Sequence, residues 1–109
     1  MLARSQRLSR RQFTDFFKAG TRYHSEYATI VFVPYPTLHG SVVVSKKVAR
    51  LAVRRNQLRR RVYHQLQIFA KQKPGVYIVI LKPTFSSLSK LQARTAVETL
   101  LQRTTTSKK

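Results

Sequence analysis

Cysteine is absent from the 109-residue sequence, which excludes a disulfide framework and a thiolate metal site. Glycine is scarce, and its three copies at Gly20, Gly40 and Gly75 stand alone, so the chain has no glycine-rich phosphate-binding loop. No apolar run approaches the length of a transmembrane helix, and the N-terminal segment lacks the apolar core of a secretory signal. We therefore expect a soluble, cytoplasmic protein that has no membrane partner.

Acidic residues are almost absent as well. The three that are present are far apart in the chain, so a pair of carboxylates for acid–base catalysis is not expected. The three histidines have few acids to orient them and no carboxylate cluster to complete a metal site. We therefore expect neither a catalytic residue nor a metal ligand in the protein. The residues concerned are Asp15, Glu26, Glu98, His24, His39 and His64.

Positive charge is abundant, with 22 lysines and arginines and a formal net charge of +19. Such an excess destabilises a compact protein by self-repulsion, and it attracts phosphate polymers or anionic membranes. The hydrophobic content of 42% is typical of a folded chain and not of a disordered basic tail. A chain of this length can bury one modest core, so we expect a single domain over residues 1–109 that is monomeric on its own.

Dense positive charge and an apolar stripe coincide in the middle of the chain. Leu51, Leu58, Val62, Leu66 and Phe69 recur at steps of seven, four, four and three, which indicates the buried face of a helix over about residues 51–71. Its like charges repel one another, whereas a solvated helix face normally alternates signs. The pattern therefore favours a polyanionic partner. The charged residues are Lys46, Lys47, Arg50, Arg54, Arg55, Arg59, Arg60 and Arg61.

Side chains that lie off this stripe are the candidates for contact with the polyanion. By helical rotation, Arg54, Asn56, Arg60 and Arg61 are predicted to project into solvent. Arg55 lies close to the stripe, so we place it at the helix entrance, beyond the core and pointing at a ligand. Arginine and lysine neutralise phosphates and release counterions, and the Asn56 amide can read a sugar or a base edge beside them.

The other elements follow from capping and strand patterns. A mobile basic arm is predicted over residues 1–8, and a capping box at Ser9–Gln12 begins a helix that ends at Gly20. Strands are predicted over residues 27–33, 41–45 and 76–81, the first two antiparallel and the third central and covered on both faces. A capping box at Ser89–Gln92 begins a final helix, and residues 104–109 are predicted as a polar tail. The order α-β-β-α-β-α predicts an α+β sandwich with helices packed on a small mixed sheet.

The first helix carries three phenylalanines. Phe13 and Phe17 lie one turn apart beside a strand, so they are candidates for a platform on which single-stranded bases stack. The spacing is equally compatible with all three phenylalanines lying in the core. Phe16 is the predicted core member, because two faces of one helix cannot both look into a groove.

Three segments carry a resemblance to a known family. They are RLSRRQFTDFFKAGTR, VSKKVARLAVRRNQLRRRV and YIVILKP, which occur in this order over nearly the whole chain. The sequence resembles the protein subunit of bacterial ribonuclease P, whose signature is a lysine pair, an Arg-Asn-Arg motif and a further basic pair. Lys46-Lys47, Arg55-Asn56 and Arg59-Arg60 match that signature. Gln57 and Tyr63 stand where the family has arginines, and Ala49 replaces a frequent glycine.

The resemblance implies a ribosomal-protein-like fold with a left-handed β-α-β crossover, against the usual right-handed rule. It also implies that an RNA subunit is the ribozyme, which uses bound Mg²⁺ to cut precursor tRNA, and that the protein alone is inactive. The basic residues and Asn56 would dock on the RNA subunit. A groove between the first helix and the sheet would bind the 5′ leader, with Phe13, Phe17, Tyr27 and Ile30 as the candidate residues.

Three other readings stay open at this point. Small basic α+β domains are common among ribosomal proteins that bind RNA only structurally. A DNA-binding protein would insert the basic helix in a major groove, but no helix-turn-helix neighbour or dimer interface is evident. A membrane-surface helix is also conceivable, although Asn56 and the clustered arginines favour phosphate recognition.

Overall fold

The computed structural model describes residues 7–106, and it is an α+β fold with a mixed sheet, as predicted. The sheet has four strands, one more than the sequence predicted. The elements are α1 (Arg10–Ala19), β1 (Thr21–His24), β2 (Ala28–Pro34), β3 (His39–Val43), α2 (Ala52–Phe69), β4 (Gly75–Leu81), the 3₁₀ helix η2 (Pro83–Ser87) and α3 (Lys90–Thr106). No helix within these residues is long and apolar enough to cross a membrane.

The strand order in the sheet is β1-β2-β4-β3. The prediction that β4 is central is confirmed, since it pairs antiparallel with β2 on one side and parallel with β3 on the other. The predicted antiparallel strands β2 and β3 run in opposite directions but are not neighbours, because β4 lies between them. A parallel neighbour needs a crossover connection, and α2 forms the crossover between β3 and β4.

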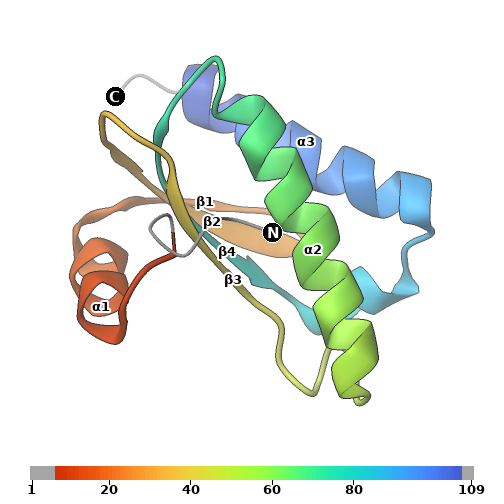
Figure 1. Ribbon diagram of the computed structural model, residues 1–109. Helices are drawn as coiled ribbons and strands as arrows, with labels where there is room; N and C mark the ends of the chain where they lie inside the picture. Colours follow the sequence, from red (N-terminus) through yellow and green to blue (C-terminus); the bar gives the residue numbers. More distant parts are fainter. Residues whose placement is uncertain (1–6, 107–109) are drawn as a thin grey trace.

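Helices cover both faces of the sheet (Figure 1). The helix α1 packs on one face against β2 and β4, whereas α2 and α3 pack together on the other face. The main core lies between the sheet and the α2–α3 layer, where Ile30, Tyr77 and Val79 are fully buried. Side chains alternate along a strand, so the buried Val31 and Ile78 point to the α1 face.

Both capping boxes form as predicted. The Ser9 hydroxyl accepts from the Gln12 amide at 3.2 Å, and the Gln12 side chain accepts from the Ser9 amide at 2.9 Å. Ser89 and Gln92 make the same pair of bonds at the start of α3. Each box satisfies two amides that the first helical turn leaves without a partner. The sequence therefore predicted the starts of α1 and α3 correctly from these two Ser–Gln pairs.

Gly20 ends α1 as predicted, for a different physical reason. Its φ of −78° is ordinary extended backbone, so the left-handed conformation that usually selects glycine is not involved. A Cβ atom at Gly20 would lie 2.3 Å from Cγ1 of Val31. Glycine is needed here because the end of α1 approaches β2 too closely for any side chain.

Several boundaries differ from the prediction. The edge strand β1 was missed, because it is only four residues long and buries a single side chain, Tyr23. The helix α3 continues through Thr104, which is 2% exposed and donates its hydroxyl to the Leu101 carbonyl at 2.6 Å, so residues 104–106 are helix and not a polar tail. The remainder of that tail, residues 107–109, lies outside the described residues.

The N-terminal arm was predicted as mobile over residues 1–8. Residues 1–6 lie outside the described part of the chain, and Arg7 forms a parallel bridge with Gly40 at the edge of β3. The apolar stripe of α2 is confirmed at Leu58, Val62 and Leu66, which are buried. Leu51 is instead 68% exposed, because it is the N-cap residue and lies beyond the end of the core.

Candidate RNA interface

The lysine pair lies in a turn between β3 and α2. Val44 and Val48 are buried on either side of the turn and anchor it to the core. The amides of Val48 and Ala49 both donate to the Ser45 carbonyl, at 3.0 and 3.3 Å. This turn leaves Lys46 and Lys47 exposed at the entrance of α2. The loop therefore presents two fixed positive charges next to the basic helix.

Arg55 fastens this loop to the helix. Its Nη1 atom donates to the carbonyl oxygens of Ala49 at 3.0 Å and Arg50 at 2.8 Å. The sequence correctly placed Arg55 at the helix entrance, but one of its guanidinium nitrogens contacts the protein backbone and does not point freely at a ligand. Its position near the apolar stripe brings the guanidinium under the loop. Arg55 thus holds the segment that carries the lysine pair.

The next turn of α2 presents an amide and two guanidinium groups. Asn56 and Arg60 are exposed, and Arg59 is half-buried. The Nη2 atom of Arg59 donates to the Asn56 side-chain oxygen. The NH₂ group of the Asn56 amide is a hydrogen-bond donor that this contact does not use. These groups lie on the solvent side and the β3 side of the helix. With the loop they form one continuous basic surface, here called the docking surface: Lys46, Lys47, Arg50, Arg55, Asn56, Arg59 and Arg60.

Two predicted members of this surface lie on another side of α2. Arg54 and Arg61 are seven residues apart and share a stripe that turns toward α3, where Arg61 lines a groove between the two helices. Arg54 donates to the Gln57 side-chain oxygen at 3.1 Å. The structure therefore does not bring Arg54 and Arg61 together with the lysine pair. Both are half-buried, although solvent projection was predicted.

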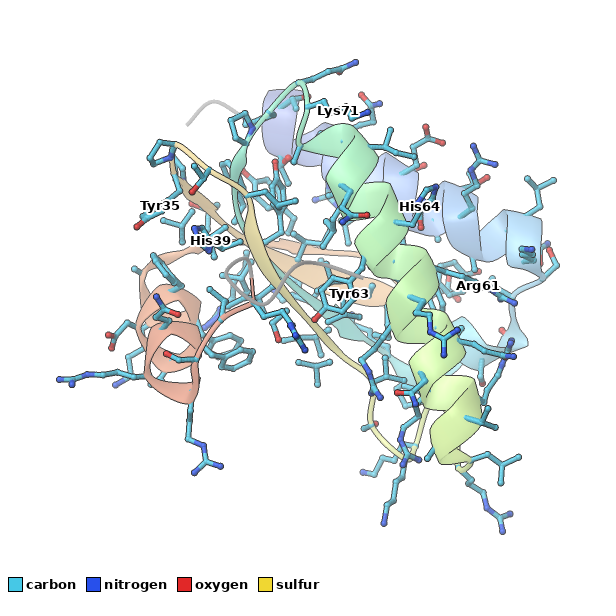
Figure 2. All side chains as sticks on the ribbon, in the orientation of Figure 1. Tyr35, His39, Arg61, Tyr63, His64 and Lys71 are labelled. Carbon is cyan, nitrogen blue, oxygen red and sulfur yellow. The ribbon has the colours of Figure 1, made fainter. Side chains whose placement is uncertain are left out.

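Tyr63 connects α2 to the edge of the sheet. It is buried, and its hydroxyl accepts a hydrogen bond from the Val42 amide at 3.2 Å. Figure 2 shows this side chain extending from α2 toward β3. The tyrosine that replaces a frequent arginine of the family is therefore a structural contact, and in this chain the position does not face the docking surface.

The phenylalanine pair on α1 forms a stacked platform. The rings of Phe13 and Phe17 lie 5.8 Å apart with an interplanar angle of 8°. The Arg22 guanidinium lies 4.2 Å from the centre of the Phe17 ring and also donates to the Phe17 carbonyl at 3.1 Å. Neither ring is buried in the core, so the core interpretation is wrong for this pair, and the role of the pair in base stacking stays a prediction.

Arg22 was missed by sequence reasoning. It lies on β1, which was itself not predicted, and it pairs with Val31 of β2 in the sheet register. The sequence signal that could have found it is that Arg22 and Tyr23 are adjacent. On a strand, adjacent side chains point to opposite faces, so burial of Tyr23 leaves Arg22 on the other face. Arg22 adds a positive charge to the platform.

Two predicted leader-binding residues lie elsewhere. Ile30 is fully buried in the core between the sheet and the α2–α3 layer, on the opposite face from α1. Tyr27 is partly buried and packs against the same core. The prediction for Ile30 is wrong, because alternation along β2 sends Ile30 away from the α1 face and sends Val31 toward it. Tyr27 precedes β2 and packs against the core, so the structure does not place it beside Phe13 and Phe17.

Phe16 was predicted to lie in the core and does not. It is half-buried and packs edge-to-face on Tyr35, with the ring centres 5.8 Å apart. Tyr35 in turn lies 5.3 Å from the His39 ring, and Figure 2 shows the two together at the turn between β2 and β3. The helix α1 thus uses one aromatic side to contact this turn and another to form the platform.

Two of the histidines contact neighbouring threonines. Among residues 7–106, no group of three His, Cys, Asp or Glu side chains comes together as a metal-binding cluster. The Nδ1 atom of His24 lies 3.0 Å from the Thr29 hydroxyl, and Nε2 of His39 lies 2.9 Å from the Thr37 hydroxyl. These contacts orient the two rings against neighbouring threonines.

Comparison with known proteins agrees with the fold. The family model for ribonuclease P matches residues 2–105. The ribonuclease P protein component of Coprothermobacter proteolyticus is 36% identical over 89 residues, which cover 81% of this chain and 73% of that protein. The corresponding protein of Pseudanabaena is 36% identical over 92 residues, covering 80% of this chain and 79% of the relative.

Solved structures give the same result. The ribonuclease P protein from Thermotoga maritima is 28% identical, with a TM-score of 0.71 over 89% of this chain and 96% of that one. The protein from Staphylococcus aureus superposes with a TM-score of 0.82 over 91% of this chain and 94% of that one, at 19% identity, which is evidence for the fold alone. The chain therefore belongs to the ribonuclease P protein family.

Proposed function

We propose that this protein is the RNA-binding subunit of a ribonuclease P ribonucleoprotein that removes the 5′ leader of precursor tRNA. The observation that carries the proposal is the docking surface, in which a clamped lysine turn and the Asn56–Arg59 pair coincide with the signature of the family. The family match supports this role and not a purely structural, ribosomal-type role. The reconstitution experiment described below would reveal a structural role as binding of the RNA without any effect on cleavage.

The docking surface fits the backbone of a folded RNA. Its charges come from one loop and one helix that are anchored by buried side chains, so they keep a fixed spacing when they meet phosphates. Lysine and arginine provide the electrostatic part of the affinity, and the Asn56 amide can bond to a sugar or a base edge. We assign this surface to the RNA subunit.

The platform on α1 fits the single-stranded leader. Stacked aromatic rings bind bases without regard to sequence, because every base has a π-face. Leader sequences differ between tRNAs, so this tolerance matches the task. Arg22, whose guanidinium lies over the Phe17 ring, would neutralise a phosphate of the strand that binds at the platform. The platform and the docking surface lie on opposite faces of the sheet (Figure 1), so one protein can contact both RNAs at once.

The chemical step is assigned to the RNA partner. The described residues contain no cluster that would hold the Mg²⁺ implied by the family, so we derive no step through a metal on this chain. When bound to the RNA, Mg²⁺ supplies the activation of water for phosphodiester hydrolysis. The contribution of the protein is to bind the leader and to neutralise phosphates. This would bring the substrate and the ribozyme together at a low Mg²⁺ concentration.

Reconstitution tests this proposal. Purified protein and a bacterial ribonuclease P RNA are mixed at low Mg²⁺, and cleavage of a precursor tRNA is measured for the mixture and for each component alone. We expect cleavage that needs both components, with a 5′-phosphate on the mature product. If the protein adds nothing with several bacterial RNAs, while still binding them, the structural role replaces this one.

A further inference from the structure

An apolar groove with a positive rim lies between α2 and α3, away from the docking surface and from the platform. Its volume is about 450 Å³. The floor is apolar and includes the buried side chains of Leu58, Val62 and Phe85. Basic side chains from both helices stand around it, and these are Arg61, Lys90 and Arg94. Figure 2 shows the region beside the labelled Arg61 and His64.

Two large apolar side chains border the groove and are open to solvent. Ile68 of α2 is 53% exposed, and Leu91 of α3 is 70% exposed. Exposed apolar side chains that converge on a groove, within a basic surround, are typical of an interaction site. The two helices are held at a fixed spacing, because the Gln65 side chain donates to the Arg94 carbonyl at 2.8 Å. The groove is therefore a preformed feature of the fold.

The charges indicate which occupant fits. The basic rim calls for an acidic partner, and a second copy of this chain, with its net charge of +19, would be repelled. RNA fits less well, because the exposed side chains that border the groove, Ile68 and Leu91, are aliphatic and offer no ring on which a base can stack. The aromatic ring of the floor, Phe85, is 3% exposed and offers no face for base stacking.

We propose that this groove binds an acidic amphipathic helix of a protein partner. Apolar side chains of the partner would cover Ile68 and Leu91, and its carboxylates would pair with the rim. Helix-in-groove recognition works in this way, with apolar anchors at helical spacing and charges that fix the orientation. The interaction does not depend on the proposed role in tRNA processing, since it uses another surface.

The test uses the full-length protein and two labelled peptides of about four helical turns each. One peptide has leucines at helical spacing and glutamates elsewhere, and the other has the same composition with the spacing shuffled. Binding is measured by fluorescence anisotropy at physiological salt, which screens non-specific attraction. The variants are Leu91→Asp and Ile68→Asp. Matched controls on the same helices are Thr99→Asp and Val53→Asp, both exposed and outside the groove.

We expect the patterned peptide to bind at least about tenfold tighter than the shuffled one. Leu91→Asp and Ile68→Asp are each expected to weaken that binding about tenfold, with the controls within about twofold of the parent. Thermal melting checks that each variant is folded. If Ile68→Asp does not fold, Leu91→Asp alone still decides the test.

Three results would overturn the proposal. Equal binding of the two peptides, or an equal loss in all four variants, would mean that net charge alone attracts them. A short RNA duplex is measured in parallel. If Leu91→Asp weakens duplex binding or cleavage by the reconstituted ribonucleoprotein while Thr99→Asp does not, the groove is a nucleic-acid surface.

Discussion

At the scale of single residues, side chains that are exposed to solvent differ from neighbouring side chains that are held by the protein itself. Asn56 and Arg60 are exposed and fit direct contact, whereas the Arg55 guanidinium holds two backbone carbonyls. Phe17 and Phe16 are neighbours in sequence, yet one belongs to the stacked platform and the other packs on Tyr35. Residue type alone does not distinguish these roles. The partner of each side chain does, and it leads to three predictions.

The first concerns the platform. Phe17→Ala should weaken the binding of precursor tRNA by the reconstituted ribonucleoprotein by about tenfold, because one base–aromatic stack contributes about 1–3 kcal/mol. Binding of mature tRNA, which has no leader, should change little. Phe16→Ala is the matched control on the same helix and should leave the ratio of the two affinities as it is. Equal losses for precursor and mature tRNA with Phe17→Ala would return this residue to a structural role.

The second concerns the loop clamp. Arg55→Lys keeps the charge but loses the guanidinium that reaches two carbonyls, so we expect affinity for the RNA subunit to fall about tenfold, almost as far as with Arg55→Ala. Arg60→Lys, at an exposed position on the same helix, should stay within about threefold of the parent. Filter binding at fixed salt measures both. Full rescue by lysine at position 55 would show that the charge matters there and the clamp does not.

The third concerns alkaline pH. Burial raises the pKa of Tyr77 from 10.0 to about 12, partly offset by a hydrogen bond with Thr104. Since the folded state favours the neutral phenol, its contribution is fully present below pH 10 and is lost as the pH rises toward 12. Two pKa units correspond to about 3 kcal/mol. Urea unfolding from pH 9 to 12 should therefore show a steeper loss of stability in the parent than in Tyr77→Phe, and parallel curves would contradict this assignment.

At the scale of elements, α2 has two attachments that keep its basic residues in register with the sheet. Its apolar stripe packs on the core, and the Tyr63 hydroxyl accepts from the Val42 amide on the outer edge of β3. An edge strand has unpaired amides on one side, and a side-chain acceptor satisfies one of them. The helix and the edge strand therefore stabilise each other at the start of the docking surface.

Removing that hydroxyl tests the attachment. Tyr63→Phe leaves the ring in place and the buried Val42 amide without its acceptor, so the free energy of unfolding should fall by about 1–3 kcal/mol. Tyr35→Phe, at a position 43% exposed, should change it by less than about 0.5 kcal/mol. Urea denaturation at neutral pH measures both. Similar values for the two variants would mean that solvent or another group satisfies Val42 equally well.

At the scale of the whole molecule, a net charge of +19 acts on two equilibria in opposite directions. Like charges repel within the folded protein, and the same charges attract RNA. Salt screens both effects. The folded protein is therefore most stable when its charges are neutralised, either by dissolved ions or by the phosphates of a bound RNA.

Salt should therefore raise the stability of the protein and lower its affinity for RNA. The melting temperature of the free protein should increase between 50 and 200 mM salt as self-repulsion is screened. If about six phosphates are contacted, affinity for the RNA subunit should fall by roughly three decades over the same range, on the slope for duplexes. Thermal melts and filter binding measure the two. A melting temperature that falls with salt would contradict the self-repulsion argument.

The sequence by itself determined the features that depend on local patterns. The capping boxes at Ser9 and Ser89 fixed the starts of two helices, the apolar run before Lys82 indicated a central strand, and the spacing of Leu58, Val62 and Leu66 predicted the buried face of α2. The basic segment indicated a polyanionic partner, because like charges without acids repel one another unless a polyanion neutralises them. These inferences succeed because caps, strand alternation and helical periodicity act over a few residues.

Only the tertiary structure decided which residues meet. Ile30 was a candidate wall of the leader groove and lies in the opposite core, because the register of β2 sends Val31 to the α1 face instead. Arg22 joined the platform through a strand too short to predict. Arg61 was predicted to belong to the docking surface and instead lines the groove beside α3. Tyr63 contacts the edge strand β3 through its hydroxyl. Each outcome depends on contacts between segments distant in the chain, and such contacts leave no periodic signal in the sequence.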